Sequence, residues 1–340
     1  MNPGASPARP GPMGKRERVL AAIRGEPVDR VPMGFWMHDF ASEHSARALA
    51  DTTLQLYRKH DWDFIKPQSR ATCFAEMWGT RIVPSTEQRR MFTLREYALK
   101  SPAEFGSLKP ADASQGALAE QLEAYLAIRA EVGPEVPIVA TIFSPLTTTK
   151  YMVEGGRDAV LAFMREDPAA LERGLAAICQ TLTQHARRCI EAGIDGIFLA
   201  TTYATRPLMT PEECRRFQRP YDLPILAAVK DAPFNILHVC GDDTLFDEFI
   251  DYPVNVFSWA TTPGNPSLTE VRERTGRAVL GGLPGKPFAG MQAAELVERA
   301  ERSLRATCGC HHLLGSDCSI NPGTSDELIL AVEAAVKQAA

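Results

Sequence analysis

The sequence predicts an α/β protein with the (β/α)8 barrel fold, and three observations support this prediction. Short apolar runs alternate with amphipathic stretches of helical spacing along most of the chain, which is the order of a parallel sheet built from βα units. Eight such runs can be counted, and eight βα units close into a barrel. No glycine-rich phosphate fingerprint follows the first run, so an open doubly wound sheet is the less favoured alternative.

The length of the chain is compatible with one domain. It has 340 residues, and (β/α)8 barrels of this size form a single domain. We expect one barrel domain over residues 13–340. Residues 1–12 are rich in Pro, Gly and Ala and show no periodicity, so we expect a disordered tail there. A helix is expected at 15–24, where apolar residues follow helical spacing up to Gly25.

The eight apolar runs are short, contain many β-branched and aromatic residues, and are bounded by turn residues. In chain order, the expected strands are Val31–Met37, Asp63–Pro67, Pro137–Phe143, Gly196–Ala200, Phe234–Cys240, Val254–Trp259, Ala278–Leu283 and His312–Gly315. Helices are expected between most of them, including 49–57 and the long amphipathic stretch 169–192.

One segment interrupts this alternation. Residues 70–130, between the second and third expected strands, are too many for a simple crossover. Within this insertion, Arg81–Val83 and Arg90–Leu94 are expected to form a hairpin, and Leu118–Val132 a helix. We expect the insertion to form a rim or lid over the barrel mouth.

Composition and charge exclude several classes of function. The net charge of −5 and the lack of a basic stripe argue against a nucleic-acid partner. No apolar run reaches the roughly 18 residues of a membrane span, and no apolar core follows the N-terminus as in a signal peptide. The eight cysteines lack the spacing of a disulfide framework, which favours reduced thiols in a cytoplasmic protein without membrane contact.

Two strand ends carry soft metal ligands. Residues at i and i+2 of a strand point to the same side, so His238 and Cys240 share one face of the expected fifth strand. Cys318 follows the expected eighth strand, and the carboxyl ends of barrel strands meet at one rim, where active sites lie. One imidazole and two thiolates suit zinc. These three residues are therefore the candidate metal ligands and catalytic residues, although single buried cysteines are more often packing residues.

Other polar residues are expected at the same rim. They follow the first, second and fourth strands or adjoin Cys318, and they are candidates for substrate contacts: His38, Asp39, Gln68, Tyr203 and Asp317. Asp317 could also accept a hydrogen bond from a ligand or an amide.

A denser cluster of possible ligands, Cys308–His312, precedes the eighth strand and belongs to the opposite end of the barrel. Cys310 lies more than roughly 20 Å along an extended chain from Cys318. We therefore do not expect this cluster to be the main site.

Four motifs give the chain a wider resemblance: Glu17–Pro32, Ala75–Gly79, Ile236–Gly241 and Leu314–Ile320. The first resembles the N-terminal signature of the uroporphyrinogen decarboxylase superfamily, and the resemblance covers nearly all the chain after residue 13. The last two are similar to the zinc motifs of its corrinoid-dependent branch, the methylcobalamin:coenzyme M methyltransferases. The resemblance implies a TIM barrel, a catalytic zinc ion and a thiol substrate.

Two positions depart from the patterns of these families. True uroporphyrinogen decarboxylases carry an Arg-Gln-Ala-Gly-Arg motif after the first strand, which binds the carboxylates of the substrate. This chain has Trp36–Phe40 there, which argues against porphyrinogen decarboxylation. The coenzyme M enzymes often have an acidic zinc ligand after the sixth strand, whereas Ser258–Thr262 offers no carboxylate. The fourth ligand is then water, the substrate or a residue elsewhere in the chain.

The ligand set suits one kind of chemistry. Two thiolates and an imidazole offset the charge of zinc, which makes the ion a weak Lewis acid but leaves a coordinated substrate thiolate nucleophilic. We expect a methyltransferase that moves a methyl group from a methylated corrinoid such as methylcobalamin to a small thiol. Because no cobalamin-binding segment is visible in the chain, the corrinoid is expected on a partner protein.

Three alternatives stay open. The zinc-bound thiolate could attack another electrophile, such as an epoxide. The chain could be a uroporphyrinogen decarboxylase-like lyase. It could also be a non-enzymatic barrel that carries a corrinoid or porphyrin, with a structural zinc ion or none; structural zinc normally has four protein ligands, and only three can be named. The sequence names neither the thiol nor the oligomeric state.

Overall fold

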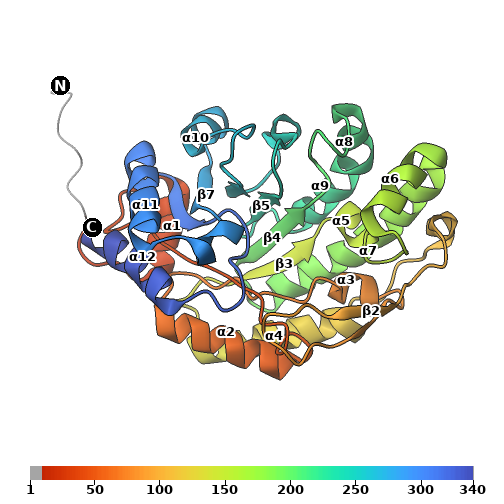
Figure 1. The fold of residues 1–340 in the computed structure, drawn as a ribbon, viewed down its shortest axis with the longest axis horizontal. Coiled ribbons are helices and arrows are strands. Elements are labelled where there is room, and N and C mark those ends of the chain that lie inside the picture. Colours follow the sequence, from red (N-terminus) through yellow and green to blue (C-terminus); the bar gives the residue numbers. More distant parts are fainter. Residues whose placement is uncertain (1–9, 340) are drawn as a thin grey trace.

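The computed structural model describes residues 10–339, so residues 1–9 of the expected tail lie outside it. Its centre is a six-stranded parallel sheet in which the strands follow one another in chain order (Figure 1). The strands are β3 (Val139–Phe143), β4 (Gly196–Thr201), β5 (Ile236–Val239), β6 (Val256–Trp259), β7 (Ala278–Leu283) and β8 (His312–Ser316). They confirm the third to eighth predicted strands. Almost every residue in them is buried, as expected for parallel strands that are covered on both faces.

The barrel is closed by the two segments expected to be the first and second strands. Both are extended, but they pair only through single parallel bridges, Met33 with Leu314, Met37 with Ile320, and Ile65 with Ile138. The first segment is hydrogen-bonded to the second by the Met33 carbonyl, which accepts from the Asp63 amide at 2.9 Å. The α/β barrel is therefore confirmed, although two of its eight positions are not regular strands.

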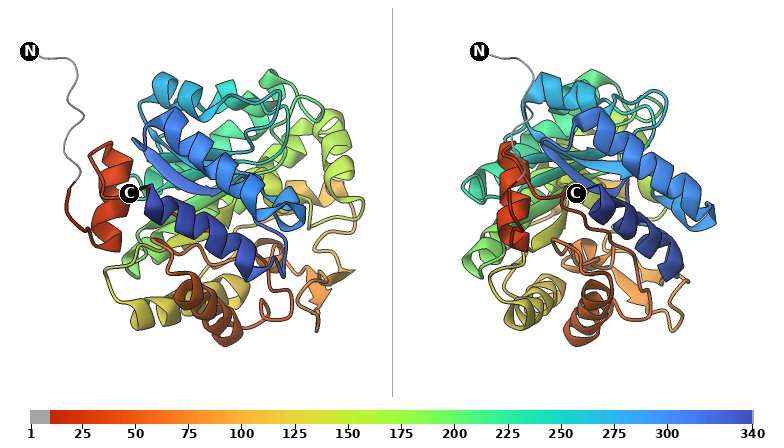
Figure 2. Two further views of the ribbon diagram at one scale, coloured as in Figure 1. Left: turned by 60° about the vertical axis from the view of Figure 1, so that its left-hand side comes forward. Right: turned by 90° about the vertical axis from the view of Figure 1, so that its left-hand side faces the viewer.

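Helices cover the outside of the sheet (Figures 1 and 2). They are α1 (Lys15–Arg24), α2 (Ala46–His60), α3 (Cys73–Glu76), α4 (Gly116–Val132), α5 (Pro145–Thr149), α6 (Gly156–Glu166), α7 (Pro168–Glu191), α8 (Pro211–Phe217), α9 (Arg219–Ala228), α10 (Leu268–Thr275), α11 (Ala293–Thr307) and α12 (Asp326–Gln338). The helices predicted at 15–24, 49–57, 118–132 and 169–192 correspond to α1, α2, α4 and α7. Short 3-10 turns lie at Pro102–Ser107, Phe246–Phe249 and Lys286–Gly290. No helix within residues 10–339 is long and apolar enough to cross a membrane.

The interior of the barrel is filled by large apolar side chains from the strands. Phe64, Phe198, Phe234 and Leu280 belong to this core, and Val19 of α1 packs against it. Phe64 and Phe234 meet edge to face at 5.3 Å between ring centroids. Because the interior is packed, space for a ligand is left only at the ends of the barrel.

The insertion contains a hairpin at the predicted place, but its second strand is Thr93–Glu96 and not Arg90–Leu94. β1 (Arg81–Val83) and β2 (Thr93–Glu96) pair antiparallel, with Ile82 opposite Leu94 and Val83 opposite Thr93. The Phe40 amide donates to the Gln88 carbonyl at 3.1 Å. This bond ties the hairpin to the loop that follows the first barrel segment, at the carboxyl end of the barrel.

Candidate metal centre

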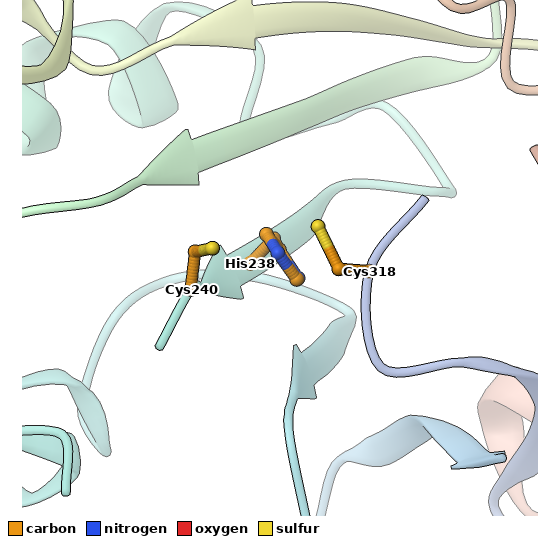
Figure 3. Close-up of side chains that lie close together, drawn as sticks. All are labelled: His238, Cys240 and Cys318. Carbon is orange, nitrogen blue, oxygen red and sulfur yellow. The ribbon is translucent and has the colours of Figure 1, made fainter. Parts of the chain in front are cut away.

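Three side chains converge at the carboxyl end of the sheet. His238 lies on β5, Cys240 directly follows that strand, and Cys318 follows β8. One ligand atom from each residue lies within 4.8 Å of the other two (Figure 3). No other group of three or more His, Cys, Asp or Glu side chains within residues 10–339 has this geometry. The structure therefore brings together the three residues that the sequence singled out.

The two ring nitrogens of His238 have different surroundings. Nδ1 lies 3.2 Å from the Ser258 hydroxyl on the neighbouring strand β6, and the ring stacks on Phe198 with 5.1 Å between centroids. Nε2 is buried and has no hydrogen-bond partner. A proton on Nδ1 is donated to the hydroxyl, which leaves the Nε2 lone pair available to a metal ion.

The two thiols are electrostatically coupled. The pKa of Cys318 is held well below its usual value, chiefly because the Cys240 thiol donates a hydrogen bond to it. The same hydrogen bond, together with burial, raises the pKa of Cys240 well above its usual value. Two thiolates this close repel each other, so a cation is needed to compensate their charge when both are ionised.

The donor set fits zinc. Two sulfur atoms and one unpaired imidazole nitrogen match the ligand types and number of a catalytic zinc site, in which a fourth position stays open. The Ser258–Thr262 segment supplies no carboxylate, and the Ser258 hydroxyl contacts His238.

Lys66 lies near this ligand set and is almost fully buried. Its Nζ lies 4.7 Å from the ring centroid of Phe198, which also stacks on His238, and 5.2 Å from that of Trp36. Burial lowers the pKa of Lys66 to about 7, and the negative charges of Cys318 and Glu43 offset only part of that shift.

A chain of hydrogen bonds runs from Lys66 to a buried carboxylate. Lys66 donates to Gln68 Oε1 at 2.5 Å, and Gln68 Nε2 lies 2.9 Å from His38 Nε2. His38 Nδ1 lies 2.5 Å from Glu43 Oε1. His38 and Gln68, which we expected to contact the substrate, thus have protein partners that hold them in the wall of the mouth.

Lys150 lies near the thiols, and Arg157 lies near Lys150. The Lys150 Nζ lies 3.4 Å from the Thr202 hydroxyl and 4.9 Å from the centroid of the Tyr151 ring. Burial, and then the charge of Arg157, lower the pKa of Lys150 to about 8, while Cys240 and Cys318 act in the opposite direction. Arg157 lies 5.6 Å from the centroid of the Tyr203 ring, and its buried Nε has no hydrogen-bond partner. Within residues 10–339, neither cation forms an ion pair with a carboxylate.

The other residues expected at the rim have separate environments. The Asp39 carboxylate accepts from the amides of Ala41 and Ser42 and shapes a turn. Tyr203 is fully buried, and its hydroxyl lies 3.4 Å from that of Thr149. Asp317 is buried beside Cys318, and burial raises its pKa to about 7.

The denser cysteine cluster lies away from this centre. Cys308 is exposed, and the Cys310 thiol contacts the carbonyl of Gly25, directly after α1, at 3.6 Å. Both cysteines line a groove of about 710 Å³ that is formed with the ends of α11 and α12. This position agrees with the sequence-based rejection of the cluster.

Sequence reasoning missed Lys66, Lys150, Arg157 and Glu43. Of these, only Lys66 could have been noticed in the sequence, because it is a charged residue inside the otherwise apolar run Phe64–Pro67. The other three lie outside the expected strands, and their position depends on how the loops and short helices pack.

Comparison with known proteins places the chain in a family. The sequence profile described as uroporphyrinogen decarboxylase (URO-D) matches residues 14–339. The chain belongs to this family. It is 25% identical over 343 residues to the methylcobamide:CoM methyltransferase MtaA of Methanosarcina barkeri, covering 94% of this chain and 96% of that protein. It is 26% identical over 238 residues to the uroporphyrinogen decarboxylase of Idiomarina loihiensis, covering 63% and 64% of the two chains.

A solved structure of another protein has the same fold as this chain. A methyltransferase from Methanosarcina mazei superposes with a TM-score of 0.83 at 22% identity, covering 96% of this chain and 99% of the other. The resemblance inferred from the motifs is confirmed, and the chain groups with enzymes of the methyltransferase branch.

Proposed function

We propose that this protein is a zinc-dependent methyltransferase that moves a methyl group from a methylated corrinoid to a small thiol. The observation that carries the proposal is the convergence of His238, Cys240 and Cys318 within 4.8 Å, with His238 Nε2 buried and unpaired. The similarity to methylcobamide:CoM methyltransferases over almost the full chain supports the same reaction class.

The residues have distinct roles in this proposal. His238, Cys240 and Cys318 hold the zinc ion, and Ser258 fixes the orientation of the imidazole. When bound, zinc lowers the pKa of a substrate thiol and keeps the thiolate nucleophilic. The packed aromatic floor of Trp36 and Phe198 keeps water from the inner side of the site.

The cations at the mouth suggest which thiols fit. Lys150 and Arg157 have no carboxylate partner within residues 10–339, and they lie at the same end of the barrel as the thiols. A thiol that also carries an acidic group would place that group against these cations. We therefore propose an anionic thiol as the methyl acceptor.

Zinc content and methyl transfer test the proposal together. Purified wild type is expected to contain one zinc ion per chain and to demethylate methylcobalamin in the presence of 2-mercaptoethanesulfonate faster than with uncharged 2-mercaptoethanol. Cys318→Ser should lose zinc and activity, whereas Cys310→Ser, at the other end of the barrel, should retain both.

Three outcomes would contradict parts of this proposal. Wild type without bound metal would refute the zinc mechanism. Bound zinc without methyl transfer to any thiol would redirect the proposal to another electrophile, such as an epoxide. Equal rates with the charged and uncharged thiols would refute only the anionic acceptor.

A further inference from the structure

The β1–β2 hairpin exposes an unusual number of apolar side chains. Val83, Met91 and Tyr97 are 52%, 55% and 37% exposed. Within residues 10–339 only two other large apolar side chains are exposed, Leu126 on α4 and Leu330 on α12. Apolar side chains that cluster on one exposed element mark an interaction surface more often than single exposed residues do.

The hairpin is also basic on an acidic protein. Residues 81–97 contain four arginines and two glutamates and no other charged residue, which gives a net charge of +2, whereas the whole chain carries −5. Arg95 belongs to β2 and shares a strand face with Thr93, which lies opposite Val83. Met, Tyr and Arg are among the residues enriched at protein interfaces. An apolar centre with basic neighbours fits an acidic protein surface.

The position of the hairpin relates this surface to the metal centre. Arg89 donates to the Gly323 carbonyl at 3.0 Å, and Gly323 belongs to the loop after β8 that also contains Cys318. Ser85 donates its amide to His44, in the loop after the first barrel segment, at 3.3 Å. A protein bound to the hairpin would therefore lie beside the loop that carries Cys318.

We propose that the hairpin surface formed by Val83, Met91, Arg95 and Tyr97 is the docking site for the protein that carries the methylated corrinoid. This inference rests on the proposed function, because a carrier must bring its methyl group to the mouth and so must contact the rim. A second copy of the chain is a poorer occupant. A two-fold symmetric contact would set the +2 hairpin against itself, which is electrostatically unfavourable.

Two methyl donors separate docking from catalysis. Methyl transfer to the thiol is measured for the zinc-loaded enzyme with free methylcobalamin and with methylcobalamin loaded on corrinoid-binding proteins that wild type accepts as donors. The test variant is Met91→Glu combined with Arg95→Glu, and the matched control is Leu330→Glu on α12. All three substituted side chains are exposed, so the fold should tolerate the changes.

The double variant is expected to lose about tenfold or more in kcat/KM with the corrinoid protein and to stay within about twofold of wild type with free methylcobalamin. Leu330→Glu should match wild type with both donors.

Each other outcome overturns the proposal. Equal losses with both donors would mean that the hairpin serves the active site itself, and unchanged rates would exclude it as the docking site. A wild type that uses free methylcobalamin but no corrinoid protein would also refute it. A wild-type homodimer that is detected by light scattering and is disrupted in the double variant would also refute the proposal. Failure of wild type with free methylcobalamin would instead refute the proposed function, and the docking proposal with it.

Discussion

The hydroxyl of Ser258 should control how tightly the ligand set binds zinc. It is buried and is the partner of His238 Nδ1 at 3.2 Å, and no other partner holds that nitrogen within residues 10–339. In Ser258→Ala the imidazole loses the contact that fixes the orientation of Nε2 beside the two thiols. Loss of such a contact to a metal-binding histidine typically lowers metal affinity about 10- to 100-fold, or about 1.4 to 2.7 kcal/mol.

In the assay, the protein and a chelator of known affinity compete for zinc, and the fraction of protein with bound zinc is measured as the free zinc concentration is varied. The matched control is Ser303→Ala, which removes another buried hydroxyl but one that bonds to the Ala300 carbonyl on α11. We expect a weaker zinc complex only in Ser258→Ala. Zinc affinity within about twofold of wild type, or an equal loss in Ser303→Ala, would refute the orienting role.

Three further predictions concern pH, packing and the acceptor. Burial raises the pKa of Asp222 from 3.8 to about 7. As pH rises between these values, Asp222 loses its proton in the unfolded chain but keeps it in the folded protein, so wild-type stability should fall. Asp222→Asn should therefore gain stability in urea unfolding above pH 7, by about 4 kcal/mol at most, and lose this gain near pH 4. In Gly196→Ala the new Cβ would lie 2.1 Å from the Phe234 carbonyl oxygen, which should destabilise the β4–β5 pair by about 1 to 3 kcal/mol; Gly290→Ala, with open space around it, should not. Lys150→Met should raise KM about tenfold for 2-mercaptoethanesulfonate and leave KM for 2-mercaptoethanol unchanged, as measured by initial rates of methylcobalamin demethylation.

The alternation of apolar runs and amphipathic stretches was sufficient to predict the barrel. The strand ends were less predictable, because β5 begins at Ile236 although the apolar run begins at Phe234. The Asn235 side chain bonds to the Ile197 amide and the Val229 carbonyl, so local side-chain contacts compete with the ladder there. The first two segments pair only at single bridges, and Pro32 and Pro67 lack the amide donor that a regular ladder needs.

The ligand set could be predicted for a different reason. Side chains alternate between the two faces of a strand, so His238 and Cys240 lie on one face. The barrel fold then brings the carboxyl ends of β5 and β8 to one rim. The environment of Lys66 could not be predicted in this way. It depends on which way Gln68, His38 and Glu43 turn once their loops are packed, and no sequence period encodes that.

The single bridges at the first two barrel positions imply that local stability is unequal around the barrel. β5 lies inside the continuous ladder and β8 ends it, whereas the first segment, next to β8, is held by isolated backbone hydrogen bonds such as that from Gly34 to Leu314. Opening there breaks fewer backbone hydrogen bonds than opening of the ladder, although it exposes buried side chains such as Trp36 and Phe64. In hydrogen exchange the Gly34 amide should exchange faster than that of His238. A local opening at the first two barrel positions would move Lys66 and Gln68 while His238 and Cys240, at the end of β5, stay in place.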